Sequence, residues 1–262
     1  MSQEQEVLLT PLGEGVFEIR LNRPERMNAL GVATVAALQQ AVADATAQRA
    51  RVLLIKGTGR AFCAGADLKE RKGMDLQGKL DHNAGINAAV NAVAGARCVT
   101  VAVINGLALG GGLEMALACD LRLAAAGVSI GLTESRVGAF PGAGGTQRLS
   151  RAIGRSRALQ LMLTGEPVTS EYAEHIGLVS EVVPAEALDA RALALGQLLA
   201  SRSATAQAEI KRLVSQGLEL PLTAGLQLER AALPGIFSSV DYAEGLAAFA
   251  EKRPPQFTGV VH

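Results

Sequence analysis

The sequence is poor in aromatic residues, with no tryptophan, two tyrosines and six phenylalanines. It also has no excess of either charge, because 25 lysines and arginines balance 25 aspartates and glutamates. Balanced charge provides no broad attraction to DNA, RNA or anionic lipid, so an anionic ligand must be bound locally. No run approaches the roughly 18 uninterrupted apolar residues of a membrane-spanning helix. We therefore expect neither a nucleic-acid partner nor a membrane partner.

Cysteine and histidine are too few and too scattered for a metal site. The cysteines are Cys63, Cys98 and Cys119, and the histidines are His82, His175 and His262. They show neither zinc-finger spacing nor the HExxH pattern of a metallohydrolase, so we expect no metal. An odd number of cysteines in apolar or small-residue surroundings predicts buried free thiols in a reducing compartment. The N-terminus, MSQEQEVLLT, has no basic-then-apolar targeting pattern, so we predict a cytoplasmic protein.

Small aliphatic residues dominate what is present, and 49% of the 262 residues are apolar. This length and composition predict one large domain, or one domain with a small appendage, around a complete hydrophobic core. Residues 16–21 alternate polar and apolar, which is typical of a half-buried strand. The apolar residues of 32–49 recur at helical spacing, which predicts an amphipathic helix.

Two segments of the chain share one pattern. RVLLIKG, ending at Gly57, and TVAVING, ending at Gly106, are apolar runs typical of strands covered on both faces. Each continues through a small-residue, glycine-containing loop into a helical pattern, and the two glycines lie 49 positions apart. Repetition at this scale indicates stacked turns of a superhelix. A third short strand is predicted at 128–132, before an irregular segment that contains PGAGG.

The chain after residue 184 is mostly helical by periodicity, from 186 to 250. We expect breaks at four places only: Gly217, Pro221, Pro234 and Ser238–Ser239. The pattern predicts a core with the active site at residues 1–200 and a helical C-terminal oligomerisation region at 201–262.

The segment NGLALGGGLEMALACD carries the first sign of a catalytic site. Three consecutive glycines between a strand and a helix weaken both elements, so packing gives them little reason to occur. A bare backbone lets the peptide N–H of Gly111 approach a ligand oxygen, and the start of the following helix adds positive partial charge. Glu114 falls in the first turn of that helix. Alternatively, Glu114 only caps the helix behind a tight turn.

GRAFCAGADLKER predicts a second turn of this kind. Ala64, Gly65 and Ala66 present backbone with little side chain, and Asp67 is placed to cap a helix that begins at Leu68. Either turn alone is a weak signal, but two on equivalent repeats supply two N–H donors to one oxygen. Such a pair stabilises a carbonyl oxygen as it becomes an oxyanion, so the two turns indicate enolate or acyl chemistry.

Five segments of the sequence match one known family. GRAFCAGADLKE, INGLALGGGLEMALACD, LTESRVGAFPGAGGTQRLSRAIG and EGLAAFAEKRPPQF closely resemble, in order, the motif blocks of the enoyl-CoA hydratase (crotonase) family, and RPERMNAL resembles its RPxxxNAL loop. The resemblance runs from about 16 to 257 and looks most like short-chain enoyl-CoA hydratases and methylglutaconyl-CoA hydratases. It implies an α/β fold, a crotonase-type spiral of repeated strand-strand-helix turns with a C-terminal helical region. It also implies an acyl-CoA thioester substrate, no separate cofactor, and a homohexamer built as a dimer of trimers.

The resemblance also implies roles for individual residues. The family's oxyanion hole falls on the peptide N–H groups of Ala66 and Gly111, and its acid/base pair falls on Glu114 and Glu134. Substrate-binding positions fall on Arg26, Ala64, Ala66, Asp67, Leu68, Lys69 and Gly111. Arg26 and Lys69 are the candidate partners of the CoA phosphates, or are solvated surface charges.

Two carboxylates suit hydration of a 2,3-double bond, because one group activates water at C3 while the other delivers a proton at C2. Isomerisation needs one proton shuttle, which resembling isomerases place at the position of Glu134 alone. The resemblance therefore predicts an enoyl-CoA hydratase, with an isomerase or a methylglutaconyl-CoA-type hydratase as alternatives. Without the motif blocks, Glu134 would be interpreted as a surface residue that caps Ser135 onward.

Two other classes of protein fit less well. The glycine-rich turns lack the G-x-G-x-x-G spacing of dinucleotide-binding enzymes. RNA binding, known in some relatives through a lysine-rich first helix, lacks that basic footprint here. Arg148, Arg151, Arg155 and Arg157 are interpreted as a solvated helix face or a subunit contact. The resemblance also implies that residues 72–90 roof the acyl pocket, but their composition does not define the acyl chain.

Overall fold

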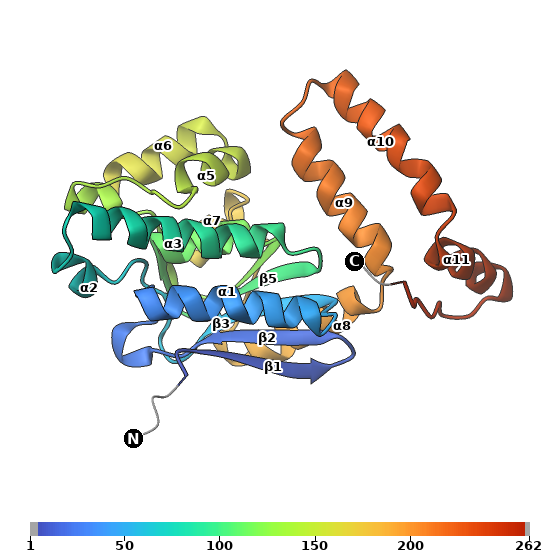
Figure 1. The fold of residues 1–262 in the computed structure, drawn as a ribbon, viewed down its shortest axis with the longest axis horizontal. Helices are drawn as coiled ribbons and strands as arrows, with labels where there is room; N and C mark the ends of the chain where they lie inside the picture. Colours follow the sequence, from blue (N-terminus) through green and yellow to red (C-terminus); the bar gives the residue numbers. More distant parts are fainter. Residues whose placement is uncertain (1–4, 260–262) are drawn as a thin grey trace.

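A computed structural model describes residues 5–259 as a mixed α/β structure (Figure 1). Residues 1–4 and 260–262 lie outside the described residues. The first range belongs to the N-terminus that we expect to lack a targeting signal, and the second contains His262. Over the described range no helix is long and apolar enough to cross a membrane. That range also contains no group of three or more His, Cys, Asp or Glu side chains placed to hold a metal ion.

The centre of the described chain is a six-stranded sheet in the order β1-β2-β3-β5-β7-β10. Its strands are β1 (Val7–Gly13), β2 (Val16–Leu21), β3 (Val52–Gly57), β5 (Val99–Ile104), β7 (Leu121–Ala125) and β10 (Glu181–Val183). β1 pairs antiparallel with β2, and all other neighbours are parallel. The strand predicted at 16–21 coincides with β2, and the two apolar runs form β3 and β5.

Both faces of this sheet are covered. Along β3, Leu53 and Ile55 enter one hydrophobic cluster, while Val52 and Leu54 enter a second cluster on the other face. Because successive side chains of a strand point to opposite faces, a strand buried on both sides is a continuous apolar run. The interpretation of RVLLIKG as a doubly covered strand is therefore confirmed.

A second sheet in the described part of the chain consists of four short strands, in the order β4-β6-β8-β9. They are β4 (Ala61–Cys63), β6 (Leu107–Leu109), β8 (Ser129–Gly131) and β9 (Val168–Thr169). The chain passes from β3 to β4, from β5 to β6 and from β7 to β8, and each pair leads into helix, which is the predicted spiral of strand-strand-helix turns. The turns need Gly57 and Gly106, because a Cβ there would lie 2.2 Å from Ala61 O or 2.1 Å from Arg60 O.

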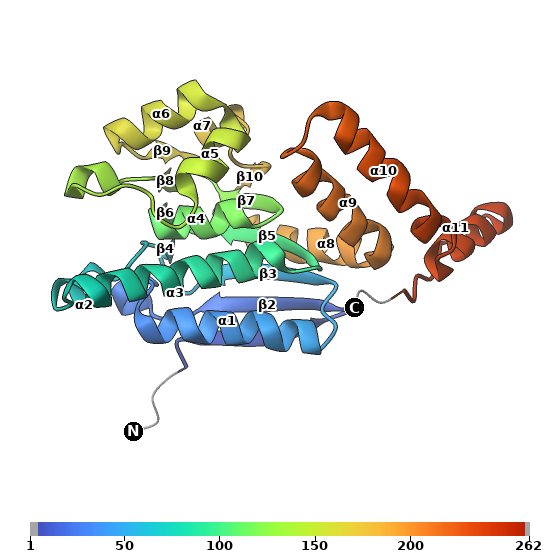
Figure 2. The same cartoon turned by 45° about the horizontal axis from the view of Figure 1, so that its top comes forward.

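Helices pack on the two faces of the large sheet (Figure 2). α1 (Val32–Ala47) and α3 (Leu76–Gly95) share the first hydrophobic cluster, and α8 (Leu188–Ala200) belongs to the second. α1 ends before the predicted end at Arg49, because Arg49 has a φ of 58°, outside the right-handed helical region. The other elements of the core are η1 (Pro24–Arg26), α2 (Leu68–Lys72), α4 (Gly111–Ala118), η2 (Glu134–Val137), α5 (Gly145–Ile153), α6 (Arg155–Thr164), α7 (Ser170–His175) and η3 (Ala185–Ala187).

Three further helices stand away from the sheets in both views (Figures 1 and 2). They are α9 (Ala204–Gly217), α10 (Leu222–Phe237) and α11 (Val240–Glu251), and together they are called the C-terminal arm. The breaks at Gly217, Pro221 and Ser238–Ser239 are confirmed, but the break predicted at Pro234 is wrong, because Pro234 lies inside α10. It lies three residues before the last residue of the helix, and the carbonyl whose helical partner it removes belongs to Arg230, an exposed residue. The expectation of four breaks only is also wrong, because the chain leaves the helical conformation at 201–203, between α8 and α9.

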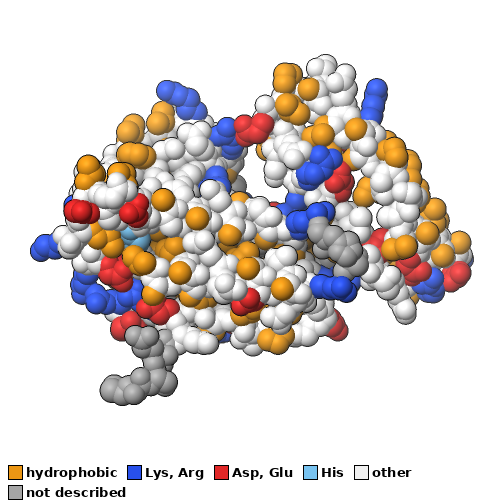
Figure 3. Space-filling model, viewed as in Figure 1, with side chains coloured by type: hydrophobic (Ala, Val, Ile, Leu, Met, Phe, Trp, Pro, Cys, Tyr) orange, Lys and Arg blue, Asp and Glu red, His pale blue; other side chains and the backbone are white. Residues whose placement is uncertain are grey.

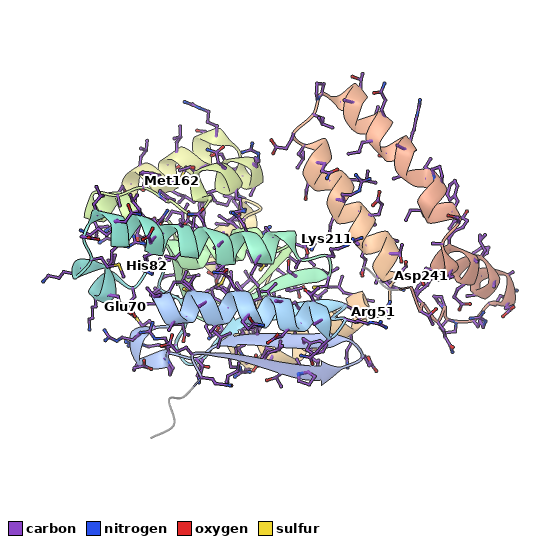
Figure 4. All side chains as sticks on the ribbon, viewed as in Figure 1. Arg51, Glu70, His82, Met162, Lys211 and Asp241 are labelled. Carbon is purple, nitrogen blue, oxygen red and sulfur yellow. The ribbon has the colours of Figure 1, made fainter. Side chains whose placement is uncertain are left out.

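Basic side chains tie the C-terminal arm and its flanking segments to the core, among them Lys211 and Arg51, which Figure 4 labels, and Arg151 of α5, which lies 3.2 Å from Glu219. Lys211 of α9 forms a salt bridge of 2.7 Å with Asp120 and also donates to two backbone carbonyls just before β5. Arg51 donates to the carbonyl oxygens of Arg202 at 2.8 Å and Phe257 at 3.1 Å.

The cysteines are free, as expected. Cys63 and Cys119 are buried, but Cys98 is only half-buried. The prediction of a fully buried thiol is wrong for Cys98, because this residue lies at the edge of the core where Lys211 crosses over from the arm.

Candidate active site

Two turns meet at the carboxyl ends of β4 and β6, which are adjacent parallel strands. Ala66 lies in the turn from β4 to α2, and Gly111 begins α4 directly after β6. Neither peptide N–H donates a hydrogen bond to an acceptor within residues 5–259. A Cβ built on Gly111 would lie 3.6 Å from the Ala66 nitrogen, so the two free donors are neighbours. The turns singled out from the sequence therefore lie side by side.

Backbone hydrogen bonds hold the first turn in place. Leu30 N donates to Gly65 O at 2.7 Å, and Asp67 N donates to Leu30 O at 3.1 Å. These two bonds form a parallel bridge between Leu30 and Ala66. Because both neighbours of Ala66 face Leu30, the N–H of Ala66 itself points to the opposite side, where it is free for a ligand.

The triple glycine serves packing as well as access to the backbone. A Cβ on Gly112 would lie 2.2 Å from Cys63 O, and Gly110 has a φ of 51°, in the left-handed region that favours glycine. The expectation that packing gives these glycines little reason to occur is therefore wrong for Gly110 and Gly112. Only Gly111 has room for a side chain, since its nearest contact would be the flexible Cδ1 of Leu30 at 3.3 Å.

Glu114 lies in the first turn of α4 and is buried. Its Oε1 accepts hydrogen bonds from the amides of Ala143 and Gly145, both at 2.7 Å, and these residues belong to the PGAGG segment. Glu114 therefore binds a distant loop with its carboxylate and does not cap its own helix. Burial raises the pKa of Glu114 above its usual value, and the two amides and the positive charge of Arg148 offset only part of this rise. These donors favour the ionised form.

Glu134 begins η2, three residues after the end of β8. It is half-buried, and its Oε2 is buried without a hydrogen-bond partner among the described residues. A Cβ on Gly110 would lie 3.0 Å from its Oε1, so the carboxyl group lies against the glycine turn. Burial, followed by the negative charge of Glu114, raises the pKa of Glu134 to about 7. Glu134 is therefore no solvated surface residue, and its surroundings favour the protonated form.

The other predicted binding residues fall into two groups. Ala64 and Leu68 line the same pocket as Ala66, Gly111 and the two glutamates. Asp67, Arg26 and Lys69 lie outside that lining. Asp67 caps α2 as predicted, by accepting hydrogen bonds from two backbone amides of its first turn. Arg26 is half-buried and Lys69 exposed, and within the described chain neither side chain forms a hydrogen bond or a salt bridge.

Several residues of the pocket wall were not identified from the sequence. They are Arg71, Asn83, Ile86, Thr133, Val137, Ala139, Phe140, Gly142 and Ala143. Arg71 follows Leu68 by three positions on one helix face, and this spacing could have identified it. Asn83 and Ile86 belong to the predicted roof segment, which α3 supplies with the same helical spacing. The loop after β8 carries no comparable periodic signal.

The four arginines at 148–157 do not form one helix face, because Gly154 separates α5 from α6. Arg148 is half-buried and donates to Ala143 O at 3.0 Å and to Asn91 Oδ1 at 2.8 Å. Its interpretation as a solvated residue is wrong, because its guanidinium fixes the loop that holds Glu114, while a subunit contact stays a prediction.

Comparison with known proteins gives a consistent result. The sequence profile of the family described as Enoyl-CoA hydratase/isomerase matches residues 12–260. A probable enoyl-CoA hydratase of Mycobacterium tuberculosis is 39% identical over 254 residues, which cover 97% of this chain and 98% of that protein. The mitochondrial methylglutaconyl-CoA hydratase of Mus musculus is 38% identical over 251 residues, which cover 94% of this chain and 80% of that protein.

A solved structure shows the same likeness at the level of the fold. The enoyl-CoA hydratase from Bacillus anthracis has 40% sequence identity and a TM-score of 0.95, and the match covers 97% of this chain and 100% of that chain. The predicted crotonase-type α/β fold is thus confirmed. The chain belongs to the enoyl-CoA hydratase/isomerase family.

Proposed function

We propose that this protein is an enoyl-CoA hydratase, which adds water across the 2,3-double bond of a trans-2-enoyl-CoA thioester to give a 3-hydroxyacyl-CoA. The observation that carries the proposal is one pocket lined by two carboxyl groups in unlike surroundings and by two free peptide N–H groups. Family membership supports the substrate class, an acyl-CoA thioester.

The thioester oxygen would bind between the N–H groups of Ala66 and Gly111. As water attacks C3, electrons move onto this oxygen and an enolate forms. Two donors fixed in advance stabilise that charge, because they need no reorganisation during the reaction. Gly111 also stands at the first position of α4, so the positive end of the helix dipole adds to the same stabilisation.

The two glutamates would divide the proton transfers. Burial raises the pKa of Glu114, which suits a base, and two amides and the charge of Arg148 support its ionised form, so that Glu114 would take a proton from water as the C3–O bond forms. Glu134 has a buried, unpartnered oxygen and a pKa raised to about 7 by burial, which suits a protonated acid that delivers its proton to C2. Afterwards Glu114 is protonated and Glu134 ionised, and exchange with water restores the starting state.

Coenzyme A enters as part of the substrate, and we propose no separate cofactor. Arg26 and Lys69 stay candidate partners of its phosphates, because their cationic groups have no hydrogen bond or salt bridge within the described residues. We also keep the cytoplasm as the proposed location, although some relatives, such as that of Mus musculus, are named as mitochondrial.

We propose that the active protein is a hexamer built as a dimer of trimers, through the C-terminal arm. The arm exposes many large apolar side chains, visible at the right of Figure 3 along α10 and α11. Leu222 is 77% exposed and Phe249 is 86% exposed, which is unusual for apolar groups that face water.

The test is substitution of each glutamate by glutamine, which keeps shape but removes the titrating carboxyl. We expect Glu114→Gln and Glu134→Gln each to slow hydration of crotonyl-CoA by at least roughly 100-fold, the lower range for general acid–base catalysis. Glu186→Gln, at an exposed glutamate outside the pocket, is the matched control. Hydration is followed as loss of the enoyl chromophore.

Solvent deuterium exchange separates the two roles. Glu114→Gln should retain exchange at C2 better than Glu134→Gln does, if the C2 proton passes through Glu134. Wild-type hydration rates in either variant would contradict the two-carboxylate mechanism. An isomerase activity that needs Glu134 but not Glu114 would then be the better assignment.

A further inference from the structure

Arg71 is the one basic side chain in the wall of the candidate active site, as far as the described residues show. It lies near the end of α2 and is half-buried. Its Nε and Nη2 are buried, and neither atom has a hydrogen-bond partner among residues 5–259. A buried guanidinium nitrogen without a partner is costly, because the hydrogen bonds to water lost on burial are not replaced.

The acidic residues nearest along the chain are already paired with other groups. Glu70 accepts from the amide of Val32 at 3.0 Å and lies 3.5 Å from Arg23, and Figure 4 shows it on α2. Asp67 caps α2 and lies 3.3 Å from the same arginine. Arg71 itself forms no salt bridge within the described chain. Its charge is thus left for a group that enters the pocket.

The surrounding wall is otherwise neutral and largely apolar, apart from the two catalytic glutamates. Leu68, Ile86, Val137 and Phe140 line it. Asn83 accepts no hydrogen bond from the buried Nε or Nη2 of Arg71, and its own Nδ2 donates to Gly142 O at 3.3 Å. A plain alkyl chain in this pocket would satisfy the apolar wall but leave the guanidinium unpaired. An anionic oxygen pair on the acyl group would satisfy both.

We infer that the acyl group of the substrate carries a carboxylate at its far end, and that Arg71 binds this carboxylate. The inference rests on the proposed function, because it takes the pocket beside the two glutamates as the acyl site. Arginine suits this task, since its planar fork of N–H donors matches the two oxygens of a carboxylate. Arg71 is then a specificity-determining residue, and it takes no part in the proton transfers at C2 and C3.

Binding of unreactive thioesters tests the inference without relying on catalysis. The two probes are glutaryl-CoA and 5-methylhexanoyl-CoA, in which an isopropyl group replaces the carboxylate with the same number of heavy atoms. Calorimetric titration of the wild type should show glutaryl-CoA binding more tightly. Arg71→Met should weaken glutaryl-CoA binding by about 10- to 100-fold, the range for hydrogen bonds to charged groups. Binding of 5-methylhexanoyl-CoA should be unchanged or tighter.

Lys72→Met is the matched control, because it removes a positive charge from the next position of α2, which is exposed and outside the pocket lining. It should leave the ratio of the two affinities as in the wild type. If Arg71→Met is unfolded by circular dichroism, Arg71→Gln replaces it. Equal affinities of the wild-type protein for the two probes would overturn the inference. An equal loss for both probes in the Arg71 variant would overturn it as well, since Arg71 would then bind a CoA phosphate.

Turnover separates this inference from the proposed function. Glutaconyl-CoA and 5-methyl-trans-2-hexenoyl-CoA are the reactive counterparts of the two probes. Glutaconyl-CoA should be hydrated with the higher kcat/KM. Selective binding of glutaryl-CoA without hydration of either enoyl thioester would refute the hydratase and support the carboxylate site. Hydration of both thioesters at equal kcat/KM would support the hydratase and refute the site.

Discussion

Glu114 and Glu134 are the same residue type in one pocket, and burial raises the pKa of both, but only Glu114 has amide donors and a nearby arginine that offset part of this rise. Glu114 accepts two short hydrogen bonds from amides, whereas the buried oxygen of Glu134 has no partner among the described residues. The negative charge of Glu114 further raises the pKa of Glu134. The proposed mechanism uses this difference: Glu134, whose pKa is raised to about 7, would hold the proton as the acid, and Glu114, which accepts from two amides, would be the base.

The pH dependence of hydration should report this pair. Glu134 must be protonated to deliver a proton, and its pKa is about 7, so kcat/KM should fall as pH rises above about 7. At lower pH, protonation of Glu114 should reduce activity, which gives a bell-shaped profile whose apparent pKa values belong to the coupled pair. Rates measured from pH 5 to 9 in buffers of constant ionic strength check this. Activity that rises steadily through pH 8 would show that Glu134 acts as the base.

The stability of the fold should also depend on pH through the raised pKa of Glu134. The folded-state pKa of Glu134 is raised from 4.5 to about 7, so its contribution to folding is complete below pH 4.5 and is lost as pH rises through about 7. Glu134→Gln cannot ionise, so its melting temperature relative to the wild type should be higher at pH 8 than at pH 5. Differential scanning fluorimetry at the two pH values measures this difference. The same difference at both pH values would contradict the raised pKa.

At the scale of elements, the β6–α4 turn combines three glycines with three separate requirements. Gly110 needs a positive φ, and Gly112 packs against the backbone of Cys63. Gly111 alone of the three has room for a Cβ atom. The turn thereby places the first N–H of α4 beside Ala66. The same element also positions Glu114, one helical turn further along.

Substitutions along this turn should separate packing from chemistry. Gly111→Pro removes the N–H at the first helical position, where proline suits the helix backbone, and should slow hydration by about 100- to 1,000-fold. Gly111→Ala keeps the N–H and is the matched control, with a smaller loss of rate. Unchanged hydration in a folded Gly111→Pro variant would show that this amide does not bind the thioester oxygen.

Gly112→Ala should act on stability. Its Cβ would lie 2.2 Å from Cys63 O, so the backbone must shift, at a cost of about 1–3 kcal/mol in the free energy of unfolding. Urea denaturation of the Gly111→Ala and Gly112→Ala variants compares the two positions. Equal stability of these variants would contradict the packing role of Gly112.

At the scale of the whole molecule, the C-terminal arm is joined to the core by a few polar contacts and exposes apolar side chains to water. Such a surface in one chain fits burial against other copies of the chain. We expect light scattering to give a single species with the mass of six subunits. A single species of 27.1 kDa, the mass of one chain, would contradict the assembly while leaving the proposed reaction intact.

Much of the fold could be predicted because it depends on a few consecutive residues. The buried strands, the helix cap at Asp67 and the glycine turns at Gly57 and Gly106 follow from local hydrophobic pattern and backbone sterics. The wrong predictions also started from local sequence patterns, but at these residues the surrounding structure determined the outcome. Pro234 lies near the end of an exposed helix and does not end it, and Arg148 binds a loop of the core instead of lying on a solvated face.

The sequence by itself determined the family, the spiral of repeated turns, and the candidate residues on each turn, because motif and periodicity act over short stretches. Only the tertiary structure decided how those residues affect one another. It brought the amides of 143 and 145 to Glu114, laid Glu134 against Gly110, and left two nitrogens of Arg71 in the pocket wall without a partner among residues 5–259. These outcomes depend on desolvation and on contacts between distant turns of the spiral, and both exist only once the sheets have stacked.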